Sequence, residues 1–431
     1  MIKNSLFSIA NNLLQLLVSV FSAYFIARGL GVYGKGELYL ITQIYVIFQL
    51  SFSFGLGQSI LYNIKTGGIP ANRIKSFIFC FLFLVLIILS VIYLNGDKII
   101  SKTFGFVIGD RETTLMLVIS LIGVANLLFG YELMSDPSKI VSTFIISIAS
   151  NLSYLLSILY FFYFSHLTVI SVLTSLLISI TLKAFLTFRA LNIFRTRLTF
   201  FNLSDVKKLF SYGPQFFLNS FFLTMVSRID TFFLSHYNMV EELGIYSVAV
   251  TLSELVLVVP SAIGVVLFPF LSGLNQMDQI SIVKVSSRIN LLIGILFALF
   301  FVFMGSYVID ILFGNQFSES YDILICLLPG IVAMTFSITF SNYLSSIGKP
   351  LLGTSFYVAS TVLNVILNSL FTSYYGLYAV SIIASLSYIL TTMLFVRYVL
   401  LNGQISLKDL TIPTKADVVL VTSYIKFLRK K

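Results

Sequence analysis

The stretch that decides the fold is residues 216–269, FFLNSFFLTMVSRIDTFFLSHYNMVEELGIYSVAVTLSELVLVVPSAIGVVLFP, an apolar hairpin with ionisable groups in both arms. The first arm carries Arg228 and Asp230, and the second carries Glu254. Each arm is long enough to cross a bilayer, which takes about 20 residues in a helix. Ionised groups at such depth cost from a few to roughly 10 kcal/mol, so their presence requires a structural or functional reason.

The depths of these three charges predict which of them pair. We take the first arm to leave the membrane near Tyr237 and the second to re-enter near Leu243. At about 1.5 Å per residue, Arg228 then lies about 13 Å deep and Glu254 about 16 Å deep, which makes them plausible partners. Arg228 and Asp230 are two residues apart and cannot pair within one helix. At least one charge therefore faces another helix, a water-filled cavity or a substrate.

The composition places the chain in a membrane. Of its 431 residues, 58% are hydrophobic and only 10% are charged, with a mean hydropathy of +0.99, whereas a soluble domain has about 25% charged residues. Its apolar runs are roughly 20 residues long, while the strands of a membrane barrel alternate in polarity over about 10 residues. An all-α integral membrane protein is therefore predicted.

No nucleophile or metal constellation stands out in the sequence. Cys80 and Cys326 lie in apolar segments without the clustering of a disulfide framework or a metal site. His166 and His236 occur singly, and no Asp-x-Asp pair lies in a sizeable loop, where a glycosyltransferase would hold a metal and a sugar nucleotide. No enzyme activity, metal or cofactor is expected.

The apolar runs predict twelve transmembrane helices. Connections of at most roughly 20 residues leave no room for a catalytic domain outside the membrane. The predicted segments are 6–28, 38–62, 76–94, 113–131, 140–164, 167–190, 209–236, 243–269, 288–312, 321–345, 351–374 and 376–400.

The basic residues predict the orientation of these segments. If the N-terminus is inside, 21 of the 27 Lys and Arg residues fall on the inner side and Arg228 is intramembrane. Such an imbalance predicts that both termini are cytoplasmic. It also accounts for most of the net charge of +10, so no nucleic acid partner is expected. The outer side holds only five basic residues: Arg28, Lys35, Lys98, Lys102 and Arg111.

The chain repeats itself weakly at a period near 210 residues, with matches in the same order in both halves. Six spans per half put both halves in the same orientation, so they are predicted to be parallel repeats around a central cavity, related by an axis along the membrane normal. The matches are Asn11 with Asn219, Arg73-Ile74 with Arg288-Ile289, Phe104-Gly105 with Phe313-Gly314, Gly123 with Gly330, Lys139 with Lys349, and Leu167 with Leu377.

This repeat predicts four parts of the chain. Residues 1–192 form an N-terminal lobe of six helices and residues 209–402 a C-terminal lobe of six. A basic cytoplasmic linker, 193–208, joins them, and its Asn202-Leu203-Ser204-Asp205 is typical of a turn and helix cap. In the cytoplasmic tail, 403–431, the short apolar run Ala416–Leu428 predicts a surface helix at the membrane interface.

Three further polar residues are candidates for the cavity. Asn11 and Asn219 occupy equivalent positions in the two repeats, which distinguishes them from the other intramembrane amides that bond neighbouring helices. Arg28 ends the first span and lies near the outer interface, where a long side chain can also snorkel to water.

Several motifs resemble the polysaccharide transporter family, the Wzx-type flippases of lipid-linked O-antigen or capsule repeat units in the multidrug/oligosaccharidyl-lipid/polysaccharide (MOP) superfamily. The resemblance spans essentially the whole chain, but Gly34-Lys35-Gly36 replaces the commoner Pro-Glu-aromatic-Gly pattern. The motifs are Ala27-Arg28-Gly29-Leu30-Gly31 followed by Gly34 and Gly36, Gly55-Leu56-Gly57, Ser227-Arg228-Ile229-Asp230, Leu243-Gly244-Ile245-Tyr246-Ser247 and Asn364 to Gly376.

The resemblance implies alternating access of a central cavity to the two sides of the cytoplasmic membrane, with a polyprenyl-diphosphate-linked oligosaccharide as substrate. Arg228, and second Arg28, are then the candidate cations for the diphosphate. Asp230 and Glu254 would set the charge of the empty cavity or carry a coupled proton. Coupling to H⁺ or Na⁺ stays open. Membrane lipids and the polymerase and glycosyltransferases of the same pathway are the other expected partners.

Two rival classes of protein would need a different cavity charge or different loops. A cation exporter related to the multidrug and toxin extrusion (MATE) proteins would use acidic cavity groups. Because Arg228 occurs beside two carboxylates, the residues alone do not decide whether the cavity is basic or acidic. An oligosaccharide polymerase would carry a sizeable outer loop with catalytic groups, which the sequence lacks. Arg228 itself has two readings, a substrate-binding cation or a structural salt bridge with Glu254.

Overall fold

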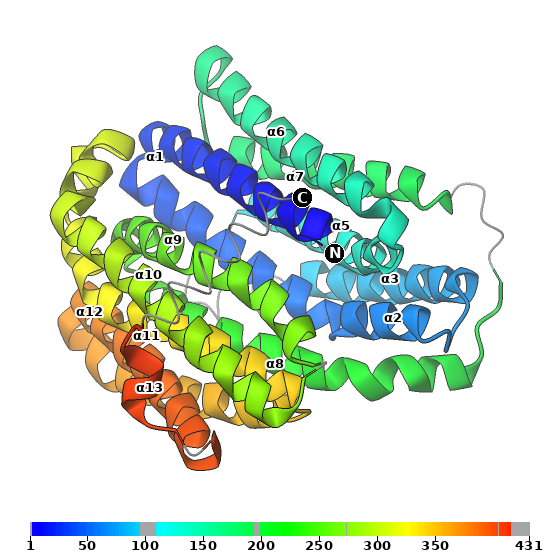
Figure 1. Ribbon diagram of the computed structural model, residues 1–431. Coiled ribbons are helices and arrows are strands. Elements are labelled where there is room, and N and C mark those ends of the chain that lie inside the picture. The colour runs from blue at the N-terminus through cyan, green and yellow to red at the C-terminus, as the bar shows by residue number, and fades with distance from the viewer. Residues whose placement is uncertain (1, 95–108, 194–198, 273, 404, 415–431) are drawn as a thin grey trace.

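Long helices run side by side through the computed structural model, which describes the chain except residues 1, 95–108, 194–198, 273, 404 and 415–431 (Figure 1). The described residues form helices and no strand. The predicted tail helix Ala416–Leu428 lies outside them. The α-helices are α1 (Ile2–Ser53), α2 (Leu56–Lys65), α3 (Ala71–Leu94), α5 (Asp110–Ser135), α6 (Ile140–Phe164), α7 (Val169–Ala190), α8 (Leu203–His236), α9 (Val240–Leu271), α10 (Gln276–Leu312), α11 (Ser320–Ser346), α12 (Pro350–Gly403) and α13 (Leu407–Thr411), with short 3₁₀ turns η1 (Pro137–Lys139) and η3 (Asn315–Phe317).

The two longest helices, α1 and α12, each contain two transmembrane segments. Gly31 and Gly376 have φ angles of 68° and 52°, a left-handed conformation that glycine adopts without steric cost, and each bends its helix sharply. Nine helices of the described part are long and apolar enough to cross a membrane, and α8 is a further long helix. With α1 and α12 counted twice, these agree with the twelve predicted segments, so the all-α membrane fold is confirmed.

One predicted segment, 38–62, is wrong as a continuous helix. Phe54 and Gly55 both have positive φ, at 46° and 68°, and they separate α1 from α2. The apolar run hid this break because Phe54 is as hydrophobic as its helical neighbours. At other ends the helices are longer than predicted: α10 begins at Gln276 instead of 288, since Asn275 caps its polar first turn by accepting a hydrogen bond from the Asp278 N–H.

Helix α8 begins inside the segment predicted as a linker and packs against both halves of the chain. Its start is capped as predicted, because the Asp205 carboxylate accepts a hydrogen bond from the Asn202 N–H at 3.1 Å. Asp205 also pairs with Arg73 of α3 at 3.5 Å, and buried Leu209 packs with the apolar side chains of α2, α3 and α5. Further along, Val226 belongs to the large core cluster that includes side chains of α9, α11 and α12. The predicted boundaries at 192, 208 and 402 stay predictions.

The two halves meet where α1 crosses α9. A Cβ on Gly36 would lie 2.0 Å from the Val240 carbonyl oxygen, and a Cβ on Gly244 would lie 2.1 Å from the Val32 carbonyl oxygen. The two contacts are related by an offset of 208 residues, so each half makes the same contact with the other. Such a reciprocal contact is what a two-fold axis between parallel repeats requires.

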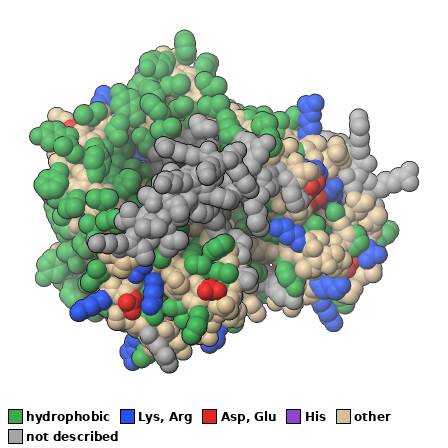
Figure 2. Space-filling view, viewed as in Figure 1, with side chains coloured by type: hydrophobic (Ala, Val, Ile, Leu, Met, Phe, Trp, Pro, Cys, Tyr) green, Lys and Arg blue, Asp and Glu red, His purple; other side chains and the backbone are tan. Residues whose placement is uncertain are grey.

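The surface is divided by side-chain type as a membrane requires. In Figure 2, Lys, Arg, Asp and Glu gather at the right edge and in the lower part of the view, and hydrophobic side chains cover much of the upper left. The right edge is where α3 and α8 begin in the same view, and the lower part is where α13 lies (Figure 1). Both regions carry the basic residues that predict a cytoplasmic side.

Candidate functional site

Arg228 lies at the junction of α1, α8 and α9. Its Nη2 atom forms an ion pair with Glu254 Oε1 of α9 at 2.7 Å, and its Nη1 atom donates a hydrogen bond to the Tyr39 hydroxyl of α1 at 3.1 Å. The predicted partnership of Arg228 and Glu254 is therefore confirmed. Tyr39 comes from the first half of the chain, so the guanidinium joins the two halves.

The paired side chains of this cluster are partly exposed. The Arg228 side chain is 21% exposed and that of Glu254 is 39% exposed, in contrast to a dry ion pair in a helix contact. A guanidinium presents five N–H donors in a planar fork that matches the paired oxygens of a phosphate. An anion that reached Arg228 would compete with Glu254 and Tyr39 for those donors.

Asp230 belongs to a separate, completely buried network among α8, α9 and α12. The Tyr246 hydroxyl donates to Asp230 Oδ2 at 3.2 Å, and the Asn368 amide donates to Asp230 Oδ1 at 3.1 Å. Asn368 Nδ2 also lies 2.7 Å from Asn364 Oδ1, and the Thr372 hydroxyl donates to Asn368 Oδ1 at 2.7 Å. None of these five side chains is more than 1% exposed.

The charge of Asp230 is surrounded by neutral hydrogen-bond donors. Within the described part of the chain, no Lys or Arg forms an ion pair with it, and Arg228 two residues away points to other partners. A buried carboxylate without a counter-charge is costly, and binding of a proton or a cation neutralises it. The network offers oxygen atoms of Asp230, Asn364, Tyr246 and Thr372, the donor type that hard cations prefer.

Sequence reasoning missed five members of these clusters: Tyr39, Tyr246, Asn364, Asn368 and Thr372. Tyr39 was one of 23 tyrosines, and nothing in its neighbourhood distinguished it. Asn364, Asn368 and Thr372 follow a spacing of four residues that puts them on one face of α12. That spacing was the available signal.

The other predicted site residues lie elsewhere or are not described. Arg28 is exposed, donates a hydrogen bond from Nη2 to the Ile311 carbonyl of α10 at 2.9 Å, and lies over the Tyr24 ring at 4.7 Å. Asn219 is half-buried on α8 and is separated from Arg228 by about 13 Å along the helix. The Asn11 side chain lies outside the described part of the structure.

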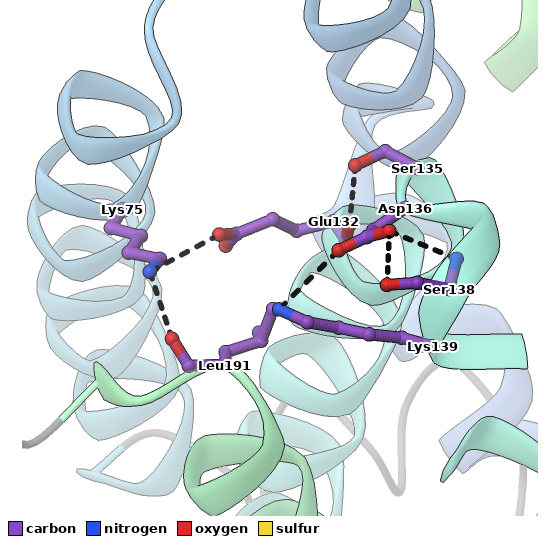
Figure 3. A network of polar contacts seen from close by, with 7 residues as sticks. All are labelled: Lys75, Glu132, Ser135, Asp136, Ser138, Lys139 and Leu191. Atoms are coloured by element: carbon purple, nitrogen blue, oxygen red, sulfur yellow. Dashed lines mark hydrogen bonds and ion pairs between the residues drawn. The ribbon is translucent and has the colours of Figure 1, made fainter. Parts of the chain in front are cut away.

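A second polar cluster joins the helices of the first half at their predicted cytoplasmic ends (Figure 3). Lys75 of α3 lies 3.6 Å from Glu132 Oε1 of α5 and donates a hydrogen bond to the Leu191 carbonyl after α7 at 3.0 Å. Beside it, the hydroxyl and N–H of Ser138 donate to Asp136 and hold the pKa of that carboxyl below its usual range. Lys75 and Glu132 are less than 10% exposed, so this pair ties helices together and is closed to a large ligand.

Comparison with known proteins identifies the family. The family described as "Polysaccharide biosynthesis protein" matches residues 1–275, and the family described as "MatE" matches residues 216–370. The chain belongs to the polysaccharide biosynthesis protein family. This membership confirms the family resemblance carried by its motifs.

The relatives agree with this assignment. The chain is 23% identical over 388 residues to the "Probable low-salt glycan biosynthesis flippase Agl15" of Haloferax volcanii. The matched region covers 89% of this chain and 80% of that protein. Its fold is similar to an inward-facing multidrug resistance MATE family transporter of the MOP superfamily, with a TM-score of 0.70, 16% identity and coverage of 89% of this chain and 93% of that one. It is equally similar to the lipid II flippase MurJ, with a TM-score of 0.70, 15% identity and coverage of 95% and 89%. These likenesses confirm a multi-pass membrane protein with the two-lobed helical fold.

Proposed function

We propose that the protein is a flippase that moves polyprenyl-diphosphate-linked oligosaccharide repeat units across the cytoplasmic membrane by alternating access. The flipped units would serve the synthesis of O-antigen, capsule or exopolysaccharide. A polymerase and glycosyltransferases of the same pathway would be its functional partners. The observation that carries the proposal is a partly exposed guanidinium, Arg228, held between the two halves by side chains from α1 and α9.

The chemistry of the substrate supports this role for Arg228. A diphosphate cannot cross hydrocarbon unassisted, because its charges would lose their hydration. A fixed cation with a bidentate fork replaces part of that hydration. Since Tyr39 and Glu254 hold the fork, binding of the diphosphate would release the bond between α1 and α8. Substrate binding would thus weaken one contact between the halves.

Asp230 is the proposed site of the coupling ion. Its network is buried, is rich in oxygen atoms and carries one negative charge without a counter-charge. These properties suit the binding of a proton or Na⁺. It lies two residues from Arg228 on the same helix. Occupancy of the network would change the packing of α8 against α12, and so the position of Arg228. We expect transport to depend on the gradient of one of these ions.

We further propose that both termini face the cytoplasm, with the lobes bounded at 1–192 and 209–402. Reporter fusions after Lys208 and after Lys431 test the orientation. Cytoplasmic signals are expected at both sites, and a periplasmic signal at either would contradict the twelve-span topology.

A MATE-like exporter of cationic drugs is the second candidate. It is favoured by the match of residues 216–370 to the MatE family and by two carboxylates near the centre of the fold, Asp230 and Glu254. The net charge of the exposed site separates the candidates. In the described structure, Glu254 is already paired with Arg228, which leaves no free acidic group there for a cationic drug.

The deciding experiment measures surface-polysaccharide export and membrane abundance together in a host that lacks its own flippase. Arg228→Ala is expected to keep normal abundance and to stop export, and Arg228→Lys to restore export only in part because the fork is lost. Normal export by well-expressed Arg228→Ala would remove this residue from the site. Drug susceptibility is measured in the same strains. Drug resistance conferred by the wild type without polysaccharide export would establish the exporter instead.

A further inference from the structure

A groove outside the proposed transport site opens between α11, α12 and α13. It has a volume of about 500 Å³, and its walls are almost wholly apolar. Ala333 and Phe336 of α11 form one wall, and Leu407 of α13 closes its end. The groove shares no helix with the Arg228 cluster, which lies on α1, α8 and α9. It therefore needs its own explanation.

The groove lies on an exposed apolar face of α12. Met393 is 61% exposed and Leu401 is 71% exposed, and both line the groove. From Ile389 to Leu401 the groove follows α12 for about 18 Å, at about 1.5 Å per residue. One leaflet of a hydrocarbon core about 30 Å thick is about 15 Å deep. The groove thus has the length of a single acyl chain.

One cation stands among these apolar walls. Arg397 is exposed, lines the groove and makes no ion pair or hydrogen bond with the described residues. It precedes the end of α12 at Gly403 by six residues, or about 9 Å, and a long basic side chain near a helix end can reach the interface. Lys408 on α13 is exposed and adds a second positive charge at this end. The nearby carboxylate of Asp409 is already paired with Lys284, at 3.6 Å.

The third wall is fixed in place. Helix α13 is held against α10 because Arg288 Nη1 donates to the Asp409 carbonyl at 2.7 Å and the Ser287 hydroxyl donates to the Leu410 carbonyl at 3.2 Å. Leu410 is completely buried beneath it. The groove is therefore a formed feature of the second half of the chain.

We propose that this groove binds an anionic phospholipid of the cytoplasmic leaflet, with one acyl chain along α12 and the phosphate on Arg397. Charge complementarity favours an anionic headgroup, since an Arg at the inner end of a transmembrane helix, without an ionic partner among the described residues, is stabilised by a phosphate. The length of the groove favours a phospholipid over a polyprenyl carrier, whose chain would extend well beyond it. The bound lipid would hold α13 to the membrane end of α12.

The chain provides a spectroscopic test because it contains no tryptophan. Met393→Trp places a single fluorophore in the groove, one helical turn before Arg397. The matched control is Phe185→Trp on α7, which is also lipid-exposed, also one turn before an exposed arginine, Arg189, and not part of the groove. Both variants are reconstituted in vesicles containing either dibromo-phosphatidylglycerol or dibromo-phosphatidylcholine at equal mole fraction.

We expect phosphatidylglycerol to quench the fluorescence of Met393→Trp at least twofold more than phosphatidylcholine does, and both lipids to quench Phe185→Trp equally. Adding Arg397→Gln should remove the difference, and Arg397→Lys should keep most of it. Equal quenching of Met393→Trp by the two lipids, or a preference that survives Arg397→Gln, would overturn the proposal. So would displacement of the brominated lipid by polyprenyl phosphate at lower concentration than by phosphatidylglycerol, because the groove would then hold the tail of a polyprenyl carrier.

Discussion

Arg228 and Asp230 are two residues apart on α8 and have opposite environments. Arg228 is partly exposed, has a counter-charge and reaches across to the first half of the chain. Asp230 is completely buried, and its hydrogen-bond partners among the described residues are neutral and belong to the second half. A helix turns about 100° per residue, so two neighbouring charges serve two different surroundings. The comparison teaches that one short motif can hold a partly exposed, paired charge and a buried charge without a counter-charge.

The largest effect on stability is expected from Asp230→Ala. It leaves the Tyr246 hydroxyl and the Asn368 amide without their acceptor in a dry site, at about 1–3 kcal/mol each. Abundance and thermal stability in detergent should fall together. Asp230→Asn keeps the shape of the side chain and should restore abundance, while transport stays at least about tenfold below wild type, within the range of ordinary coupling free energies. Wild-type transport by Asp230→Asn would remove Asp230 from the coupling site.

The next prediction compares the stability lost when Arg228 is truncated with the stability lost when the buried Lys75–Glu132 pair is broken. Lys75→Ala leaves the buried Glu132 carboxylate unpaired and should cost about 3–5 kcal/mol of stability. Arg228→Ala leaves Glu254 partly exposed to water, so its cost should stay near 1 kcal/mol or below. Thermal unfolding of the two variants measures the difference. Equal losses would contradict the view that the Arg228 site is accessible.

A smaller effect is expected from Glu254→Gln. The amide can still accept a hydrogen bond from Arg228, but the guanidinium then lacks its counter-charge and attracts anions more strongly. Transport should change severalfold with little loss of protein. The double variant Arg228→Ala with Glu254→Gln provides the control. If it recovers abundance that Arg228→Ala has lost, the pair is a structural salt bridge.

The smallest effect is expected from Tyr39→Phe. It removes a single hydrogen bond to Arg228, worth about 0.5–1.5 kcal/mol, and leaves the ring in place. Transport should change by less than about tenfold, because the ion pair with Glu254 still positions the guanidinium. Tyr45→Phe, on the same helix and without contact to Arg228, serves as control. A complete loss of transport in Tyr39→Phe alone would show that the hydroxyl has a further role.

The sequence allowed most of the fold to be predicted, and less of the site. Apolar runs and cap residues place helices well because both are local properties, and similar depth makes Arg228 and Glu254 plausible partners, as the structure confirms. Tyr39 could not be found in this way, since its meeting with Arg228 depends on how α1 crosses α8. The break at Phe54 and Gly55 escaped for a related reason: backbone conformation, not hydropathy, determines it.

The crossing of α1 and α9 has a consequence for how the two halves can change. At Gly36 and Gly244 each half presents a bare backbone to a carbonyl of the other, and a single methyl group at either position would collide with it. The two glycines therefore restrict each other: neither position can gain a side chain unless the helices move apart. Along this seam, a change in the backbone of one half therefore requires a matching change in the other.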